Sequence, residues 1–128
     1  MAAIPSDKLD LFEKKTFAHL GTLLPNGAPH VTPVWVGYDG EADRILVNTE
    51  RGRQKERNVR RNPAVGLSMI DPDNPYRYLS VTGEVDELTE DGARDHIDQL
   101  ARRYTGGAYD NPIETRRVIM RIRADTVR

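Results

Sequence analysis

The chain has 128 residues, of which 38% are hydrophobic and 30% are charged, and its formal net charge is −1. This length and composition indicate a single globular domain over residues 1–128, and the near-neutral charge argues against a surface that binds nucleic acid or an anionic membrane as a whole. The sequence has no cysteine, which excludes disulfides and thiolate metal sites, and no apolar run has the length of a signal peptide or a membrane span. We therefore expect a cytoplasmic protein.

The first predicted elements are a short helix and a β-hairpin. The helix covers residues 6–15, with Ser6 as its candidate N-cap. Two apolar stretches then flank Asn26-Gly27, a dipeptide that strongly favours a hairpin turn. In the second stretch Pro33 has no N–H to donate to a strand ladder, so it indicates a sheet edge, a bulge or a place where another group approaches.

Four more strands follow the hairpin, over residues 44–49, 64–70, 76–88 and 116–127. Gly83 lies inside the long third one of these and indicates a bulge or a kink. A short helix is predicted over residues 53–61 and ends before Pro63. A second helix follows Thr89, and its apolar stripe of Ala93, Ile97, Leu100 and Tyr104 predicts that one face packs on the sheet.

Six strands joined mainly by hairpin turns predict an antiparallel sheet. A closed or nearly closed barrel with peripheral helices buries such strands economically and removes exposed sheet edges. The predicted fold class is therefore mainly β.

The residue types that usually carry catalysis are absent or isolated. The three histidines, His19, His30 and His96, have no metal-ligand spacing, and no glycine-rich phosphate loop or nucleophile elbow is present. We therefore expect no metal site, and no catalytic residue is identified.

Positive charge gathers in one segment, where six of the twelve residues from Glu50 to Arg61 are Lys or Arg. One interpretation is purely structural: a solvated helix with internal ion pairs, such as Glu56 with Arg60 four residues later. The other interpretation is functional and rests on the position of the segment between a strand and a helix.

An anion site fits this strand-to-helix junction. Amide groups at the start of a helix point towards solvent, and the helix dipole favours negative charge there. Arg53 and Lys55 add a guanidinium fork and a point charge, and Thr49 adds a hydroxyl donor. The junction therefore predicts a phosphate cradle.

Three aromatic residues, Trp35, Tyr76 and Tyr78, can each be explained by packing alone. Together with an anion site, however, they indicate a flat aromatic ligand that carries a phosphate.

Four segments resemble the split-barrel flavin and deazaflavin oxidoreductases, which are relatives of pyridoxamine 5′-phosphate oxidase: TPVWV, NTERGRQKERNVRRNPAVGLS, DPDNPYRYLSVTGEV and RIRADTV. The similarity covers most of the chain, and it is greatest to the small proteins that use the deazaflavin coenzyme F420. The further Trp and Arg residues that serve the vitamin substrate of pyridoxamine 5′-phosphate oxidases have no counterpart, because Trp35 is the only Trp.

The resemblance implies a six-stranded antiparallel split β-barrel that forms a homodimer with two cofactor sites at the interface. The cofactor phosphate would meet Arg53 and Lys55, with Thr49 and Arg57 nearby. The strand with Pro33, Val34 and Trp35 would run along the cofactor ring. Tyr76 and Tyr78 would wall the site, from the other subunit, and the loop from Tyr104 to Tyr109 would shape the substrate mouth.

The function implied is an F420-dependent reductase that transfers a hydride from the reduced deazaflavin to a conjugated or unsaturated organic acceptor. The alternative is an FMN-binding oxidoreductase of pyridoxamine 5′-phosphate oxidase type, because one phosphate cradle serves either cofactor. A non-enzymatic cofactor-binding or nucleic-acid-binding module is the third interpretation. No RNA-binding β motif is present, however, so we expect a small-molecule substrate without nucleic acid or membrane partners.

Overall fold

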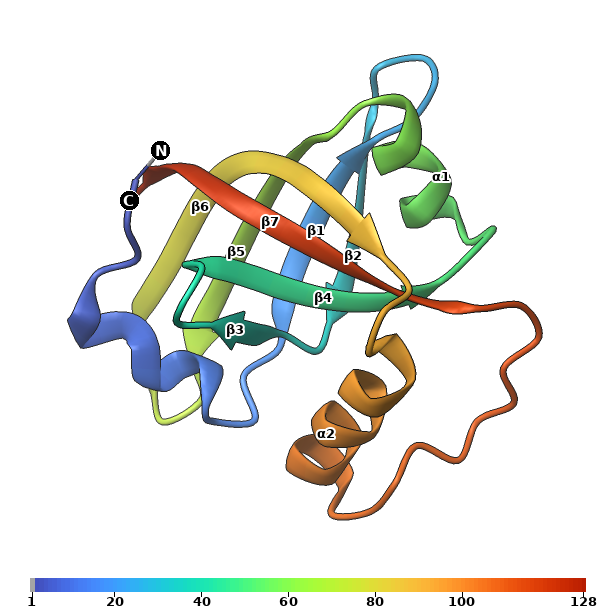
Figure 1. Ribbon diagram of the computed structural model, residues 1–128. Helices are drawn as coiled ribbons and strands as arrows, with labels where there is room; N and C mark the ends of the chain where they lie inside the picture. The colour runs from blue at the N-terminus through green and yellow to red at the C-terminus, as the bar shows by residue number, and fades with distance from the viewer. Residues whose placement is uncertain (1) are drawn as a thin grey trace.

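The computed structural model describes residues 2–128, in which one antiparallel sheet curls into a barrel around an apolar core (Figure 1). Its seven strands within these residues are β1 (Ala18–Leu23), β2 (Pro29–Val34), β3 (Gly37–Asp39), β4 (Arg44–Glu50), β5 (Ala64–Asp71), β6 (Asn74–Thr89) and β7 (Arg117–Val127). The helices are the 3₁₀ helix η1 (Ser6–Phe12), α1 (Gln54–Arg61) and α2 (Ala93–Thr105). The predicted fold class is confirmed.

Two details of the prediction need correction. The sheet has seven strands and not six, because Gly37–Asp39, for which no strand was predicted, pairs with Arg44–Leu46. The first helix is a 3₁₀ helix that ends at Phe12, and Ser6 does not cap it. Pro5 occupies the N-cap position without a side-chain hydrogen bond, and its carbonyl accepts from the Lys8 N–H in the tighter i→i+3 pattern.

The barrel is split between β2 and β4. The strand order is β2-β1-β5-β6-β7-β4-β3, so within residues 2–128 no ladder joins the first strand to the last. Because β3 covers only Arg44–Leu46, the rest of β4, from Val47 to Glu50, has no strand partner on that side in the described chain. The split therefore leaves backbone of both β2 and β4 accessible to another group.

Glycine and proline act as the sequence predicts. Gly27 adopts a left-handed φ of 85° in the β1–β2 turn, and Pro33 lies in the edge strand β2. At Gly83 the β6–β7 register shifts, and a β-carbon built there would lie 1.9 Å from the Arg123 carbonyl oxygen. The bulge therefore requires glycine.

The core lies inside the barrel, where alternate residues of each strand point. In β2, for example, Val34 is buried while Val31 and Pro33 are exposed. The predicted stripe of α2 is buried at Ala93, Ile97 and Leu100, and the helix packs against β7 and β4.

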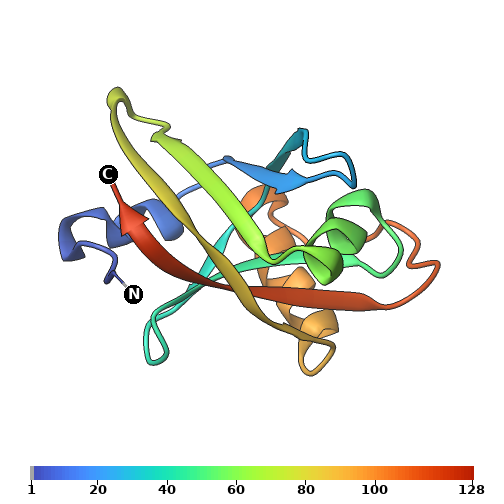
Figure 2. The ribbon, with the colours of Figure 1, turned by 90° about the horizontal axis from the view of Figure 1, so that it is seen from above.

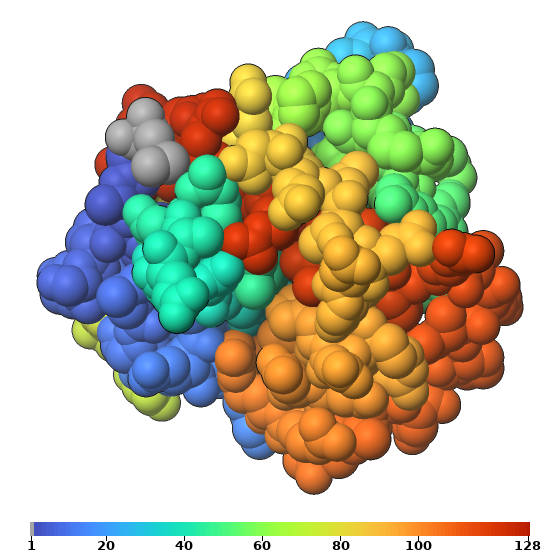
Figure 3. All heavy atoms as spheres, viewed as in Figure 1, coloured from blue at the N-terminus to red at the C-terminus, as the bar shows by residue number. Residues whose placement is uncertain are grey.

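The helices lie at different parts of the barrel. Both ribbon views place η1 and α1 at opposite ends, with η1 beside the C-terminal end of β7 (Figure 2). The space-filling view shows α2 and the segment 106–116 as one continuous surface (Figure 3). Among residues 2–128, no helix combines the length and apolar character that crossing a membrane requires.

Candidate functional site

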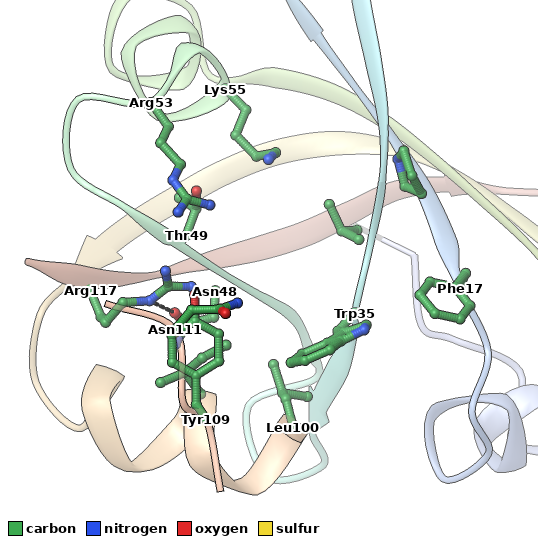
Figure 4. Close-up of a pocket in the computed structure, with 13 residues that line it drawn as sticks. Phe17, Trp35, Asn48, Thr49, Arg53, Lys55, Leu100, Tyr109, Asn111 and Arg117 are labelled. Atoms are coloured by element: carbon green, nitrogen blue, oxygen red, sulfur yellow. Dashed lines mark hydrogen bonds between the residues drawn. The ribbon is translucent and has the colours of Figure 1, made fainter. Parts of the chain in front are cut away.

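A pocket of about 250 Å³ lies at the split, and both strands that border the split line it. Pro33, Val34 and Trp35 come from β2 and its end, and Asn48 and Thr49 come from the unpartnered part of β4. Phe17 before β1, the start of α1, one face of α2, the segment 106–116 and the start of β7 complete the lining (Figure 4).

The pocket brings together six of the nine site residues that the sequence predicted: Pro33, Val34, Trp35, Thr49, Arg53 and Lys55. Arg57 lies outside the lining, and its guanidinium donates to the Gly52 carbonyl and to Gln54 Oε1. Tyr76 and Tyr78 are also outside it, in β6, with 91% and 50% of their surface exposed. Their predicted role in a second subunit's site stays a prediction.

The loop before α1 is held in place by a buried carboxylate. Glu56, at the third position of the helix, is fully buried and accepts the backbone N–H of Gly52, the residue before the N-cap Arg53, at 2.8 Å. It also forms ion pairs with Arg51 at 3.3 Å and with Arg60 at 2.5 Å. The predicted structural pair of Glu56 and Arg60 is confirmed, and it fixes the loop from which Arg53 projects.

Thr49, Arg53 and Lys55, which we call the cradle, meet at the junction of β4 and α1. Lys55 has no carboxylate within ion-pair distance in residues 2–128, and burial, followed by the charges of Arg53 and Arg117, lowers its pKa. The buried Thr49 Oγ1 has no hydrogen-bond partner in the described chain. Arg53 shares its charge with Glu50, 3.3 Å away. Such a set of donors fits an anion.

Arg117 is a pocket residue that the sequence did not reveal. Its side chain comes from the first residue of β7, is 6% exposed, and donates from Nε to Asn48 Oδ1 at 2.8 Å. The guanidinium lies 5.1 Å from the centre of the Tyr109 ring, and its Nη1 has no partner in the described residues. Burial lowers the pKa of Arg117, and the opposing charge of Glu50 does not offset this effect.

Asn48 links Arg117 to α2 through hydrogen bonds. Its Nδ2 donates to the Ala93 carbonyl at 2.9 Å and contacts His96 Nδ1 at 3.0 Å. Burial, together with the charges of Arg103 and Arg117, lowers the pKa of His96 to about 4. The histidine is therefore neutral near pH 7, and its Nδ1 can accept from the amide.

An aromatic cluster forms the opposite wall of the pocket. Trp35 stacks on Tyr104 with ring centres 5.2 Å apart and an interplanar angle of 6°. The Tyr104 hydroxyl donates to the Thr16 carbonyl at 2.5 Å and accepts the Val36 N–H at 3.3 Å, and Phe17 contacts the same ring. The cluster therefore holds Trp35 in one orientation beside the cradle.

The pocket thus combines two cations without an ion-pair partner in residues 2–128, buried donors without a hydrogen-bond partner in those residues, and a fixed aromatic wall. Residues 2–128 contain no group of His, Asp and Glu that could hold a metal ion. Such a pocket can bind a flat molecule that carries negative charge.

Comparison with known proteins identifies the family. The family model described as pyridoxamine 5′-phosphate oxidase matches residues 6–128. A solved structure named F420 reductase is 36% identical, with 98% of each chain covered and a TM-score of 0.84. A conserved hypothetical protein of Mycobacterium tuberculosis is 26% identical, with 99% of this chain and 84% of that chain covered and a TM-score of 0.78.

A more distant structure shares the fold. HupZ of Group A Streptococcus is 17% identical, with 94% of this chain and 90% of that chain covered and a TM-score of 0.64. Among curated proteins, none matches the sequence.

Proposed function

This chain belongs to the pyridoxamine 5′-phosphate oxidase family, and from that premise we propose that it is an F420-dependent reductase acting on a conjugated or unsaturated organic acceptor. The observation that carries the proposal is the cradle beside an aromatic wall, in a chain 36% identical over 98% of its length to a protein named F420 reductase. An oxidoreductase whose cofactor performs the chemistry needs no catalytic triad of its own.

The pocket suits a phosphorylated cofactor because two of its hydrogen-bond donors lack a partner. Thr49 Oγ1 is buried without a partner, and Lys55 has no carboxylate near it in residues 2–128, so an oxyanion would satisfy both groups. Arg53 and Lys55 would hold the phosphate. The exposed backbone edge at Pro33, Val34 and Trp35 would orient the ring, since β2 has no partner on its outer side in the described chain.

When bound, reduced F420 supplies the hydride. The chain positions the reactants, and Leu100 and Ile97 of α2 keep water from the inner wall of the pocket. Tyr76 and Tyr78 of a second subunit would close the site in a cytoplasmic homodimer. FMN is the alternative cofactor, favoured by the family to which the chain belongs, and a non-enzymatic binding module is the least supported function.

Titration of the purified protein with F420 and with FMN, followed by ligand fluorescence, tests the proposal. We expect micromolar or tighter binding of F420, and a loss of about 100-fold or more in the double variant Arg53→Ala with Lys55→Ala, because two charge-assisted contacts disappear.

The matched control is Arg94→Ala with Arg102→Ala, which removes the same charge from exposed positions of α2 outside the lining. It should bind as the unmodified protein does. Binding of FMN without F420 would replace the proposed cofactor, and unchanged F420 affinity in the cradle variant would remove the cradle from the site.

A further inference from the structure

The arginines of the basic segment are mostly engaged within the protein. Arg51 pairs with Glu56 and Glu90, and Arg60 pairs with Glu56. Arg61 donates to the Leu23 carbonyl. These three side chains are therefore poor candidates for binding the anionic tail of a ligand.

Arg117 differs from them in being buried and in having no ion-pair partner in residues 2–128. Only 6% of its surface is exposed, and it lines the pocket. Its Nη1 has no hydrogen-bond partner in residues 2–128. The guanidinium is not loose, because Asn48 holds its Nε and the Tyr109 ring lies beside it. The carboxylate that acts on Arg117, Glu50, does not form an ion pair with it, because Glu50 accepts from Arg53 and from the Glu114 and Thr115 N–H groups. A buried cation without an ion-pair partner costs free energy of folding, so its retention indicates a partner that arrives from outside the chain.

The position of Arg117 separates it from the cradle. Asn48 and Thr49 are neighbours in β4, so their side chains leave the strand on opposite faces. The close-up shows Arg53 and Lys55 on one side of Thr49, and Arg117 with Asn48 and Asn111 on the other (Figure 4). The two cationic groups therefore approach the pocket from different sides.

The number of unpaired cations in the pocket also bears on the ligand. Arg53 pairs with Glu50, which leaves Lys55 and Arg117 as the two cations of the pocket that have no ion-pair partner in residues 2–128. One cation suits the single negative charge of a phosphodiester, and the other suits a carboxylate, which can accept from the remaining terminal nitrogens of a guanidinium.

We propose that Arg117 binds a carboxylate on the same ligand whose phosphate lies in the cradle. The ligand class is a phosphodiester with an acidic tail, and this inference rests on the proposed function. Asn48 acts as a positioning residue, because its Oδ1 accepts the Arg117 Nε–H and holds the guanidinium.

Two probes separate this role from a third phosphate contact. F420 carries both the phosphodiester and the carboxylate tail, whereas deazaflavin riboside 5′-phosphate ends at its phosphate. We expect Arg117→Gln to weaken F420 binding about tenfold or more, as for loss of a hydrogen bond between charged groups, and to leave the affinity for the truncated probe within about twofold. Fluorescence titration of the purified protein measures both values.

The matched control is Arg116→Gln, the adjacent arginine, whose side chain is 77% exposed and pairs with Glu90 outside the pocket. It should bind both probes as the unmodified protein does. Arg117→Lys keeps the charge but shortens the reach, and it provides the same comparison if Arg117→Gln loses its cooperative thermal unfolding.

Three outcomes would overturn the inference. Equal weakening of both probes would make Arg117 a phosphate contact, and no weakening of either would make it structural; both leave the proposed function standing. If the unmodified protein binds neither probe, the proposed function fails and the inference fails with it.

Discussion

At the residue scale, the pocket depends on a histidine that stays uncharged. His96 lies on the buried face of α2, and the two charges that shift its pKa, those of Arg103 and Arg117, are positive. All three influences disfavour the imidazolium. The neutral ring leaves Nδ1 as an acceptor for Asn48, and Asn48 in turn holds Arg117.

This histidine should make stability fall in mild acid. Its pKa is about 4 in the folded state against 6.5 ordinarily, so between these values the unfolded chain binds more protons and the free energy of unfolding decreases as pH decreases. The full decrease from this group is about 3 kcal/mol. In His96→Gln this component disappears, so urea unfolding at pH 6.5 and at pH 4 should differ less than in the unmodified protein.

His19→Gln is the control for the substitution itself, because it makes the same change at an exposed residue of β1. An unchanged difference between the two pH values in His96→Gln would show that carboxylates alone govern the acid response.

The sequence could predict only part of the pocket at this scale. Thr49, Arg53 and Lys55 lie within seven residues, so their strand-to-helix junction is visible as a local pattern. Arg117 lies more than 60 residues further on, in a strand whose register against β4 places it opposite Glu50. Nothing local to Arg117 reveals that pairing, because register depends on the complete sheet.

At the element scale, the bulge in β6 depends on the absence of a side chain. Gly83→Ala would place a methyl group 1.9 Å from the Arg123 carbonyl oxygen, so the β6–β7 ladder must move apart. We expect a loss of about 3 kcal/mol or more in the free energy of unfolding, at the upper end for overpacking, measured by urea denaturation.

Gly107→Ala is the matched control, because a β-carbon at that position meets no atom within 4 Å. It should change stability by about 0.5 kcal/mol or less. Equal stability of the two variants would mean that the bulge can relax to accept alanine.

The elements themselves were predictable where the patterns are long. The apolar stretches bounded by turn residues and the stripe of α2 are sequence signals, and the structure has strands and a helix at these places. β3 was not predictable, because a three-residue strand between turn residues carries no periodicity and forms only when β4 lies beside it. Because β3 has only three residues, Val47–Glu50 of β4 has no strand partner on that side in the described chain. The strand that was hardest to predict therefore determines where the pocket opens.

At the scale of the whole molecule, one outer face of the barrel is suited to a second copy. By strand register, Val31, Ile70 and Tyr78 lie on this face of β2, β5 and β6, each at least half exposed. Between them are small residues, including Gly21 and Gly66, that allow close approach. These features support the proposed homodimer and would bring Tyr78 to its interface.

A charge on this face should prevent the association. We expect the purified chain, of 14.5 kDa, to have twice that mass in solution, and Val31→Glu to have the monomer mass, because a buried carboxylate without a partner opposes the contact. Light scattering after size-exclusion chromatography measures the mass. Ala42→Glu, in the exposed turn before β4, is the control and should remain a dimer. A dimeric Val31→Glu variant would place the interface elsewhere.

The split between β2 and β4 gives the ligand a part in the stability of the barrel. A ligand that contacts both strands binds only the folded chain, so it adds a free energy of unfolding that grows with its concentration, about 2.7 kcal/mol at one hundred times its dissociation constant. The gap in the wall therefore links folding to cofactor supply. In a cell, the amount of intact protein would rise and fall with the coenzyme, even where synthesis of the chain is constant.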